Sequence, residues 1–265
     1  MLKKIILLII ILSIFIFISK LSLDQYNQNH NIATVLKEKL DTRIVPHKVN
    51  YKNKLYNILS SDLHAFEFDT NFNTNAKIPY FEVGHDDKEL HDISFEDYLK
   101  IIKNKKIKKI WMDIKNVNEN NIHKILKRLD YLDKTYDIKD ILIFETSATT
   151  SKVKLISDAG YHTSYYIPII YALANNIFTA KKLKKQIQDQ GLKAVSFPSY
   201  LYDFVNTNLK PIIAERIVFH TWATYKFKYK DELKKIKKEK FYTDNRIKTI
   251  LFTYDNNKLN RLYNF

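Results

Sequence analysis

Two kinds of segment alternate along this chain. One kind is a short run of apolar, β-branched and aromatic residues, a pattern that favours β-strands. These runs cover residues 43–49, 64–72, 109–116, 141–147, 161–168, 193–200, 216–224 and 248–255. The other kind is an amphipathic, lysine-rich stretch with helical spacing. Such stretches cover residues 94–104, 118–135, 151–160, 179–191 and 231–240.

The order of these segments predicts the fold class. A strand followed by a helix, repeated along the chain, favours a parallel sheet covered by helices. Eight strands in a chain of 265 residues is the number found in a (β/α)8 TIM barrel, the α/β fold that we expect for a single domain at residues 42–265. A doubly wound sheet is the alternative, because the helix between the sixth and seventh strands is poorly marked.

The first 23 residues have a different pattern. Two lysines precede an apolar run from Ile5 to Ile18 that only Ser13 interrupts. A charged start before about 7–15 apolar residues is typical of a signal peptide, whereas a membrane span usually needs about 20 residues. No cleavage site of small residues follows the run. Residues 1–23 therefore favour a signal anchor over a cleaved signal peptide.

Residues 24–41 are polar and predict a linker with a short helix. With the N-terminal segment, this linker predicts a barrel that is exported and anchored to a membrane, in the periplasm or at the cell surface. If the segment is cleaved, the barrel is secreted.

Composition and charge indicate which classes of partner and which kinds of site this protein can have. The formal net charge is +15, from 44 Lys and Arg against 29 Asp and Glu. Such a surplus favours anionic partners, although a general bias of the sequence toward Lys, Asn and Ile explains it equally well. We expect no nucleic-acid partner, because the aromatic residues lie mainly in the strands and not beside the basic runs. The chain has no cysteine, which excludes disulfides, thiolate metal sites and cysteine nucleophiles.

Acidic side chains lie in the second and third predicted strands. Glu67 and Asp69 are two residues apart, so both face the same side of their strand. Asp113 and Lys115 repeat this spacing in the next strand. Neighbouring carboxylates repel each other unless a cation or a shared proton lies between them. A metal site is therefore one interpretation, and a solvated face of the sheet is the other.

Further candidates lie near the ends of other strands, where barrel enzymes carry their catalytic groups. They are His47, Asn50, Glu145, His220 and Trp222, together with His85 in the loop that follows the second strand. Each has an ordinary structural explanation when taken alone. Their position at one end of the same predicted barrel favours a site, in which Asn50, Glu145, His220 and Trp222 would line the pocket.

The ordered motifs resemble those of the glycerophosphodiester phosphodiesterase superfamily of TIM barrels, related to phospholipase C. His47 stands in HKVN, Glu67 and Asp69 form the ExD motif, His85 stands in GHDD and Asp113 begins DIK. Two details are more similar to the sphingomyelinase D-like and menorin-like relatives. HKVN stands where the glycerophosphodiester enzymes have His-Arg-Gly, and Asp113 stands where they usually have Glu. The likeness in motifs covers roughly residues 43–116.

The resemblance implies roles for these residues. It implies one divalent cation, Mg²⁺ or Ca²⁺, with oxygen ligands from Glu67, Asp69 and Asp113. His47 and His85 would flank the scissile phosphodiester, one attacking or activating the nucleophile and the other protonating the leaving alcohol. Lys115 would pair with a phosphate oxygen.

The expected function is therefore a metal-dependent phosphodiesterase, or a phospholipase D-like lyase. Its substrate would be a glycerophosphodiester or the phosphodiester of a phospholipid headgroup. One alternative is a non-catalytic binding protein or surface protein built on the same barrel. Another is a glycoside hydrolase that uses Glu67 and Glu145 as its pair of carboxylates.

Overall fold

The protein is described by a computed structural model over residues 41–61, 63–85, 93–171, 176–223 and 229–253. Its centre is a nine-stranded sheet. The strands are β1 (Ile44–Pro46), β2 (Ala65–Asn73), β3 (Tyr80–Val83), β4 (Lys109–Ile114), β5 (Leu142–Thr146), β6 (His162–Tyr166), β7 (Ala194–Pro198), β8 (Val218–Trp222) and β9 (Ile247–Phe252).

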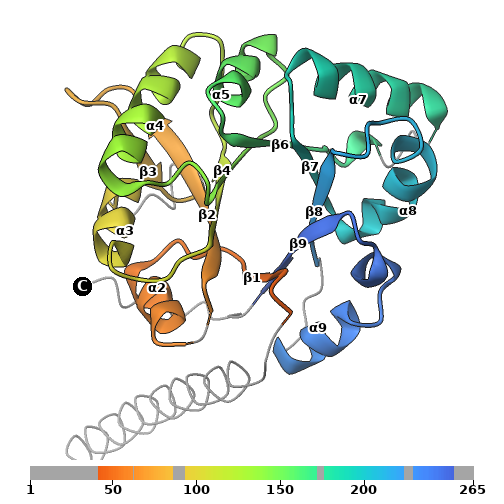
Figure 1. Cartoon of the computed structure of the whole chain (residues 1–265), viewed down its shortest axis with the longest axis horizontal. Helices are drawn as coiled ribbons and strands as arrows, with labels where there is room; N and C mark the ends of the chain where they lie inside the picture. The colour runs from red at the N-terminus through yellow and green to blue at the C-terminus, as the bar shows by residue number, and fades with distance from the viewer. Residues whose placement is uncertain (1–40, 62, 86–92, 172–175, 224–228, 254–265) are drawn as a thin grey trace, which may run out of the picture. The chain divides into compact units, whose positions relative to one another are not determined.

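Helices connect most of the strands and lie outside the ring that the strands form (Figure 1). The α-helices are α2 (Lys52–Leu59), α3 (Phe95–Ile102), α4 (Ile122–Tyr136), α5 (Lys154–Asp158), α7 (Ile177–Asp189), α8 (Tyr202–Phe204) and α9 (Tyr229–Ile236). Short 3₁₀ turns are η1 (Ser151–Val153), η2 (Ser199–Leu201) and η4 (Lys240–Thr243), and η3 (Val205–Leu209) is a π-helical turn.

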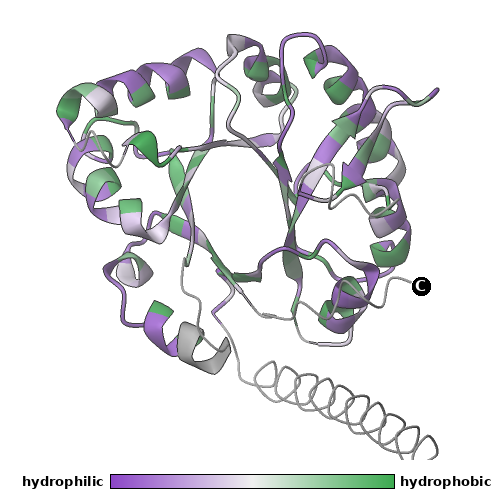
Figure 2. Ribbon diagram, turned by 180° about the vertical axis from the view of Figure 1, so that it is seen from behind, coloured by the Kyte–Doolittle hydropathy of each residue, from purple (hydrophilic) through white to green (hydrophobic). Residues whose placement is uncertain are grey.

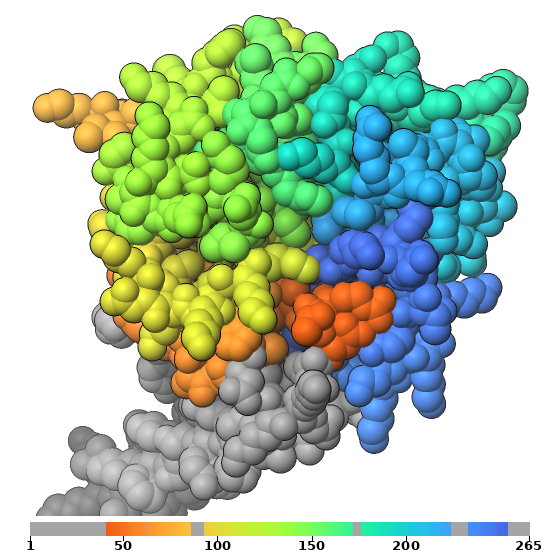
Figure 3. All heavy atoms as spheres, viewed as in Figure 1, coloured from red at the N-terminus to blue at the C-terminus, as the bar shows by residue number. Residues whose placement is uncertain are grey.

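The sheet curls back on itself. Its strand order is β1-β9-β8-β7-β6-β5-β4-β2-β3, and every pairing is parallel except that of β2 with β3. The Val49 N–H, just after β1, donates to the Glu67 carbonyl of β2 at 2.8 Å. Viewed along its axis, the curled sheet forms a ring with the helices outside (Figure 2). In the space-filling view, the orange segment that includes β1 lies between yellow and blue segments (Figure 3).

Side-chain alternation along β2 separates the core from the site. Phe68 faces outward and stacks on Phe95 of α3, with ring centroids 5.1 Å apart. Glu67 and Asp69 take the opposite face, as period-two alternation requires. Helix α3 begins with a capping box, in which the side chains of Ser94 and Asp97 each accept a hydrogen bond from the other's backbone N–H.

The observed sheet agrees with the strands predicted from the sequence. Each of the eight expected strand ranges overlaps one observed strand, and the order of the parallel strands follows the chain around the ring. The doubly wound alternative was wrong, because it would have placed sequential strands on both sides of a switch point. Strand β3 was not expected. It extends the sheet as an antiparallel neighbour of β2.

The expected signal anchor and almost all of the expected linker, residues 1–40, lie outside the described residues. Among the residues that the structure does describe, no helix is both long enough and apolar enough to cross a membrane.

Candidate active site

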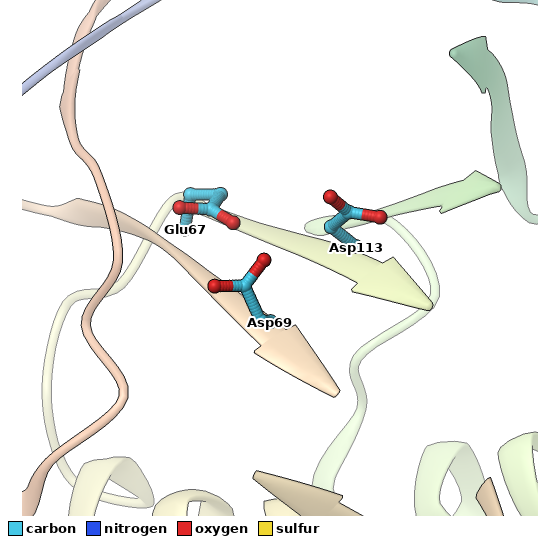
Figure 4. Close-up of side chains that lie close together, drawn as sticks. All are labelled: Glu67, Asp69 and Asp113. Atoms are coloured by element: carbon cyan, nitrogen blue, oxygen red, sulfur yellow. The ribbon is translucent and has the colours of Figure 1, made fainter. Parts of the chain in front are cut away.

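Three carboxylates meet at the carboxyl ends of two neighbouring strands. Asp69 of β2 is in register with Asp113 of β4, and Asp113 is in turn in register with Glu145 of β5. Oxygen atoms of Glu67, Asp69 and Asp113 lie within 4.8 Å of one another. These side chains gather on one side of the two strands (Figure 4). The i and i+2 spacing places two acids on one strand, and the parallel register adds the third.

A tight turn after β1 holds two of these acids. Lys48 has a left-handed backbone with φ of 57°, and its N–H donates to Glu67 Oε2 at 2.6 Å. Asn50 Nδ2 donates to Asp69 Oδ2 at 2.9 Å, and the Asp69 N–H donates to Asn50 Oδ1 at 2.9 Å. The Val49 carbonyl accepts from the hydroxyl of Tyr98 of α3 at 2.9 Å. The HKVN sequence therefore fixes the positions of both carboxylates.

Lys115 is the cation of the cluster. Its Nζ forms an ion pair with Asp69 Oδ1 at 2.7 Å and donates a hydrogen bond to Asp113 Oδ2. Burial opposes the charge of Lys115, but the two carboxylates outweigh it and raise the pKa of the amine. Burial also opposes ionisation of Asp69, yet Lys115 and Asn50 lower the pKa of that carboxyl to about 2. Asp69 is therefore the acid that Lys115 keeps ionised.

Lys115 only partly offsets the charge of the other two acids, Glu67 and Asp113. Burial, followed by the neighbouring Asp69, raises the pKa of Glu67 well above its usual value. Burial also raises the pKa of Asp113, and Asp69 contributes to that rise. The cluster therefore has more carboxylates than nearby cationic groups can stabilise.

These residues fit a divalent cation. The three ligand atoms are all oxygens, which Mg²⁺ and Ca²⁺ prefer. The carboxylates repel one another, and the pKa values of Glu67 and Asp113 are raised. A bound cation would reduce this repulsion. Glu67, Asp69 and Asp113, the ligands implied by the sequence motifs, would hold it.

Both histidines of the motifs lie at the same cleft. The cleft has a volume of about 350 Å³ and is lined by His47, Lys48, Glu67, Asp69, His85, Asp113, Lys115, Glu145, Ser147, Tyr166, Trp222 and Leu251. His47 Nε2 lies 3.6 Å from Glu67 Oε2. Burial lowers the pKa of His47 to about 3, so its imidazole is neutral at neutral pH.

Glu145 lines the cleft but has partners of its own. Trp111 Nε1–H donates to Glu145 Oε2 at 2.9 Å, and Ser196 Oγ donates to Oε1. Burial, with a contribution from Asp113, raises the pKa of Glu145 to about 8. Its carboxyl group is therefore protonated at neutral pH and serves as a polar wall beside the three acids.

The other expected pocket residues have different positions. Trp222 lines the cleft and stacks on Tyr166, with ring centroids 5.3 Å apart. Asn50 contacts Asp69 and is not among the lining residues. His220 is also not among them. It lies deeper in the barrel, where its Nε2 is 3.2 Å from His162 Nε2 and its ring is 5.2 Å from that of Trp111.

Sequence reasoning missed several residues of the cleft. Four residues that line the cleft were not among the predicted site residues: Lys48, Ser147, Tyr166 and Leu251. Tyr166 ends β6 at the level where strand-end residues face the cleft, so its position in the strand could have identified it. Ser147 and Leu251 belong to no sequence motif that could have identified them as residues of the cleft.

Comparisons with known proteins address the fold. No protein-family model matches the sequence, and no curated protein sequence matches it. A glycerophosphodiester phosphodiesterase from Parabacteroides distasonis is similar in structure, with a TM-score of 0.53 and 12% identity over 80% of this chain and 92% of that chain.

Two further solved structures agree. A protein assigned as a glycerophosphoryl diester phosphodiesterase from Agrobacterium tumefaciens has a TM-score of 0.58 and 11% identity, over 79% of this chain and 92% of that one. A protein assigned as a glycerophosphodiester phosphodiesterase from Galdieria sulphuraria has a TM-score of 0.55 and 12% identity, over 82% and 95%. The resemblance to menorin-like proteins stays a prediction. This chain therefore shares the TIM-barrel fold of these solved structures, which is the fold that its sequence predicted.

Proposed function

We propose that this protein is a metal-dependent phosphodiesterase that acts on a glycerophosphodiester or on the phosphodiester of a phospholipid headgroup. The observation that carries the proposal is the cluster of Glu67, Asp69 and Asp113, whose oxygens lie within 4.8 Å of one another in a cleft shared with two histidines. The fold shared with glycerophosphodiester phosphodiesterases supports the same reaction class.

The three carboxylates would hold one Mg²⁺ or Ca²⁺. A bound divalent cation offsets the negative charge of a phosphodiester and orients its oxygens for displacement. Lys115 adds a second positive charge, since its ammonium lies between Asp69 and Asp113 and lines the same cleft. It attracts a phosphate oxygen as a point charge.

His47 and His85 would carry out the proton transfers. One histidine attacks the phosphorus or takes a proton from the attacking group, and the other gives a proton to the leaving alcohol. Asn50 and the Lys48 N–H hold Asp69 and Glu67 in place during this step. Glu145 would donate or accept a hydrogen bond at the wall of the cleft.

We also propose that residues 1–23 anchor the exported barrel to a membrane. The supporting observations are the apolar run from Ile5 to Ile18 and the net charge of +15. A cationic protein held at an anionic membrane meets phospholipid headgroups directly, which makes them natural substrates.

The test is an assay of the full chain in detergent micelles. Its substrates are bis-p-nitrophenyl phosphate and a panel of phospholipids and glycerophosphodiesters, with Mg²⁺, Ca²⁺ or chelator. We expect turnover that requires metal, and losses of about 10²–10⁴-fold in His47→Ala and in His85→Ala. Asp113→Asn should lose both turnover and metal binding by calorimetry. His123→Ala is the matched control, because His123 is exposed on α4.

Two outcomes would contradict the proposal. Diester cleavage that persists in chelator and in both histidine variants would place the chemistry elsewhere. Absence of turnover on every diester, together with no divalent-metal binding, would leave a barrel that serves as a binding surface. Chelator-resistant cleavage of a glycoside that requires Glu67 and Glu145 would support the glycoside hydrolase alternative.

A further inference from the structure

We infer that the barrel rim beside the cleft docks onto an anionic lipid surface through an apolar patch formed by Ile169, Ile170, Phe178 and Tyr200. The inference rests on the proposed function and deepens it. It specifies that the phosphodiester substrate is presented by a membrane and not taken from free solution.

The patch is unusual for its exposure. Ile169, Ile170, Phe178 and Tyr200 are 57%, 65%, 77% and 51% exposed. Ile177, next to Phe178, is also exposed. Together these residues are more than half of the exposed large apolar side chains in the described ranges. Scattered apolar residues on a surface are ordinary, but a concentration of them in one sector marks an interaction site.

The patch lies at the same end of the barrel as the cleft. Ile169 and Ile170 come shortly after β6, Phe178 is in the first turn of α7, and Tyr200 is in η2 directly after β7. In a sheet of parallel strands, the carboxyl ends lie together, and the cleft is built at that end. The patch therefore occupies the β6 and β7 sector of the rim.

Tyr166 connects the patch to the cleft. It ends β6, lines the cleft and stacks on Trp222. Tyr166 is in register with Ser196 of the neighbouring β7, and Tyr200 comes two residues after β7 ends, so both tyrosines lie at the carboxyl ends of adjacent strands. The cleft and the patch thus share the sector of the rim at β6 and β7.

The charges around the patch favour an anionic lipid surface over a second copy of this chain. Lys181 and Lys182 are exposed on α7 directly after the patch, and neither forms an ion pair with a carboxylate of the described residues. The first turn of α7 has no acidic residue. Asp203, near Tyr200, lies 3.7 Å from Lys240. Two copies joined by this rim would bring their lysines together, whereas anionic headgroups attract them.

The first test places a reporter in the patch. The full chain with Phe178→Trp is reconstituted into vesicles of phosphatidylcholine with phosphatidylglycerol, in which the acyl chains of a fraction of the lipids are brominated. We expect bromine to quench the added emission, because the introduced indole would lie among acyl chains. Tyr131→Trp is the matched control, since Tyr131 is a 49% exposed aromatic residue on α4, and the indole introduced there should stay unquenched.

Charge dependence tests the kind of lipid. In the reconstituted Phe178→Trp chain, Lys181→Gln and Lys182→Gln should each weaken docking about fivefold, measured as the ratio of quenched to unquenched emission of the introduced indole. Pure phosphatidylcholine should give much weaker quenching than the anionic mixture. Quenching that is absent, equal in the Phe178→Trp and Tyr131→Trp chains, or independent of lipid charge would overturn the inference. So would a dimer in detergent that Phe178→Ser dissociates, which would assign the patch to a second copy.

Turnover separates docking from chemistry. Ile170→Ser combined with Phe178→Ser should lower the rate on vesicle-borne phosphodiester about tenfold or more and leave the rate on bis-p-nitrophenyl phosphate unchanged. An equal loss on both substrates would overturn the inference. If the wild-type chain cleaves no diester but quenching occurs, the proposed function fails and docking stands, because quenching requires no turnover.

Discussion

Asn50 and Asp69 bind each other through two hydrogen bonds of 2.9 Å, one from each residue to the other. The Asn50 amide donates to the Asp69 carboxylate, and the Asp69 N–H donates to the Asn50 amide oxygen. Both residues are buried, so this pair fixes the direction in which the carboxylate points. The turn after β1 and the end of β2 therefore form one unit at the site.

Asn50→Ala should weaken this unit in two measurable ways. It leaves the buried Asp69 N–H without its acceptor, which should lower the free energy of unfolding by about 1–3 kcal/mol in urea titrations with chelator. It also frees the carboxylate to rotate, which should lower metal affinity about 10–100-fold by calorimetry. Asn57→Ala, on α2, is the control. Unchanged metal affinity in Asn50→Ala would show that Asp69 needs no orienting partner.

Lys115→Met should make the fold dependent on metal. Without the ammonium, Asp69 and Asp113 repel each other, and the free energy of unfolding in chelator should fall by about 2–3 kcal/mol. Saturating Ca²⁺ or Mg²⁺ should restore much of this loss, since a ligand present at about 100 times its Kd stabilises by about 2.7 kcal/mol. The measurement is urea unfolding with chelator and with each metal.

The control for Lys115 is Lys100→Met, which breaks an exposed 3.3 Å ion pair with Asp97 on α3. Exposed pairs contribute little, so this variant should change stability by less than about 1 kcal/mol and show no new metal dependence. If Lys115→Met behaves like Lys100→Met, the two carboxylates do not depend on Lys115.

Local spacing rules predicted a large part of the site. Alternation along a strand placed Glu67 with Asp69 and Asp113 with Lys115, and strand order placed the two strands side by side. The level at which the acids meet depends on the register between β2 and β4. That register is set by packing across the whole sheet, so spacing along either strand alone could not give the distances between the carboxylates.

Other features of the site could not be predicted from any short stretch of the sequence. The contact between Asn50 and Asp69 joins residues 19 positions apart and requires the turn in which Lys48 is left-handed. Lysine gives no hint of that conformation, which glycine or asparagine would have suggested. His220 was predicted to line the pocket, but its depth in the barrel places it against His162 and not in the cleft wall. Depth in a barrel depends on strand tilt and stagger.

Glu145 should make stability fall as the pH rises. Its pKa is raised to about 8 in the folded protein, against a usual value of 4.5, so the folded state holds its proton more tightly than the unfolded state does. The stabilising effect is complete below pH 4.5 and is lost as the pH rises through about 8. Glu145→Gln resembles the protonated acid and should flatten this part of the profile.

The measurement for Glu145 is urea unfolding of both proteins in chelator from pH 5 to pH 9. The two should have similar stability at the acidic end, and the variant should be the more stable at the alkaline end. Parallel profiles across this range would mean that Glu145 has a similar pKa in the folded and unfolded states.

Two substitutions of Lys48 can distinguish the role of its left-handed backbone from the role of its side chain. Valine strongly disfavours a φ of 57°, so Lys48→Val should lower the free energy of unfolding by about 1–2 kcal/mol. It should also weaken metal binding, because the Lys48 N–H would move away from Glu67 Oε2. Lys48→Gly adopts this conformation readily and should keep metal affinity near that of the wild type.

The two Lys48 variants lose the same positive charge, so the difference between them isolates the conformation of the turn. Calorimetry with Ca²⁺ and Mg²⁺ measures it directly. If the charge of Lys48 attracts the substrate, both variants should raise KM for a phosphodiester to a similar extent, while only Lys48→Val loses metal. Equal metal affinity in the two variants would show that the hydrogen bond to Glu67 does not depend on the left-handed backbone, and the turn would lose its role in holding the acid.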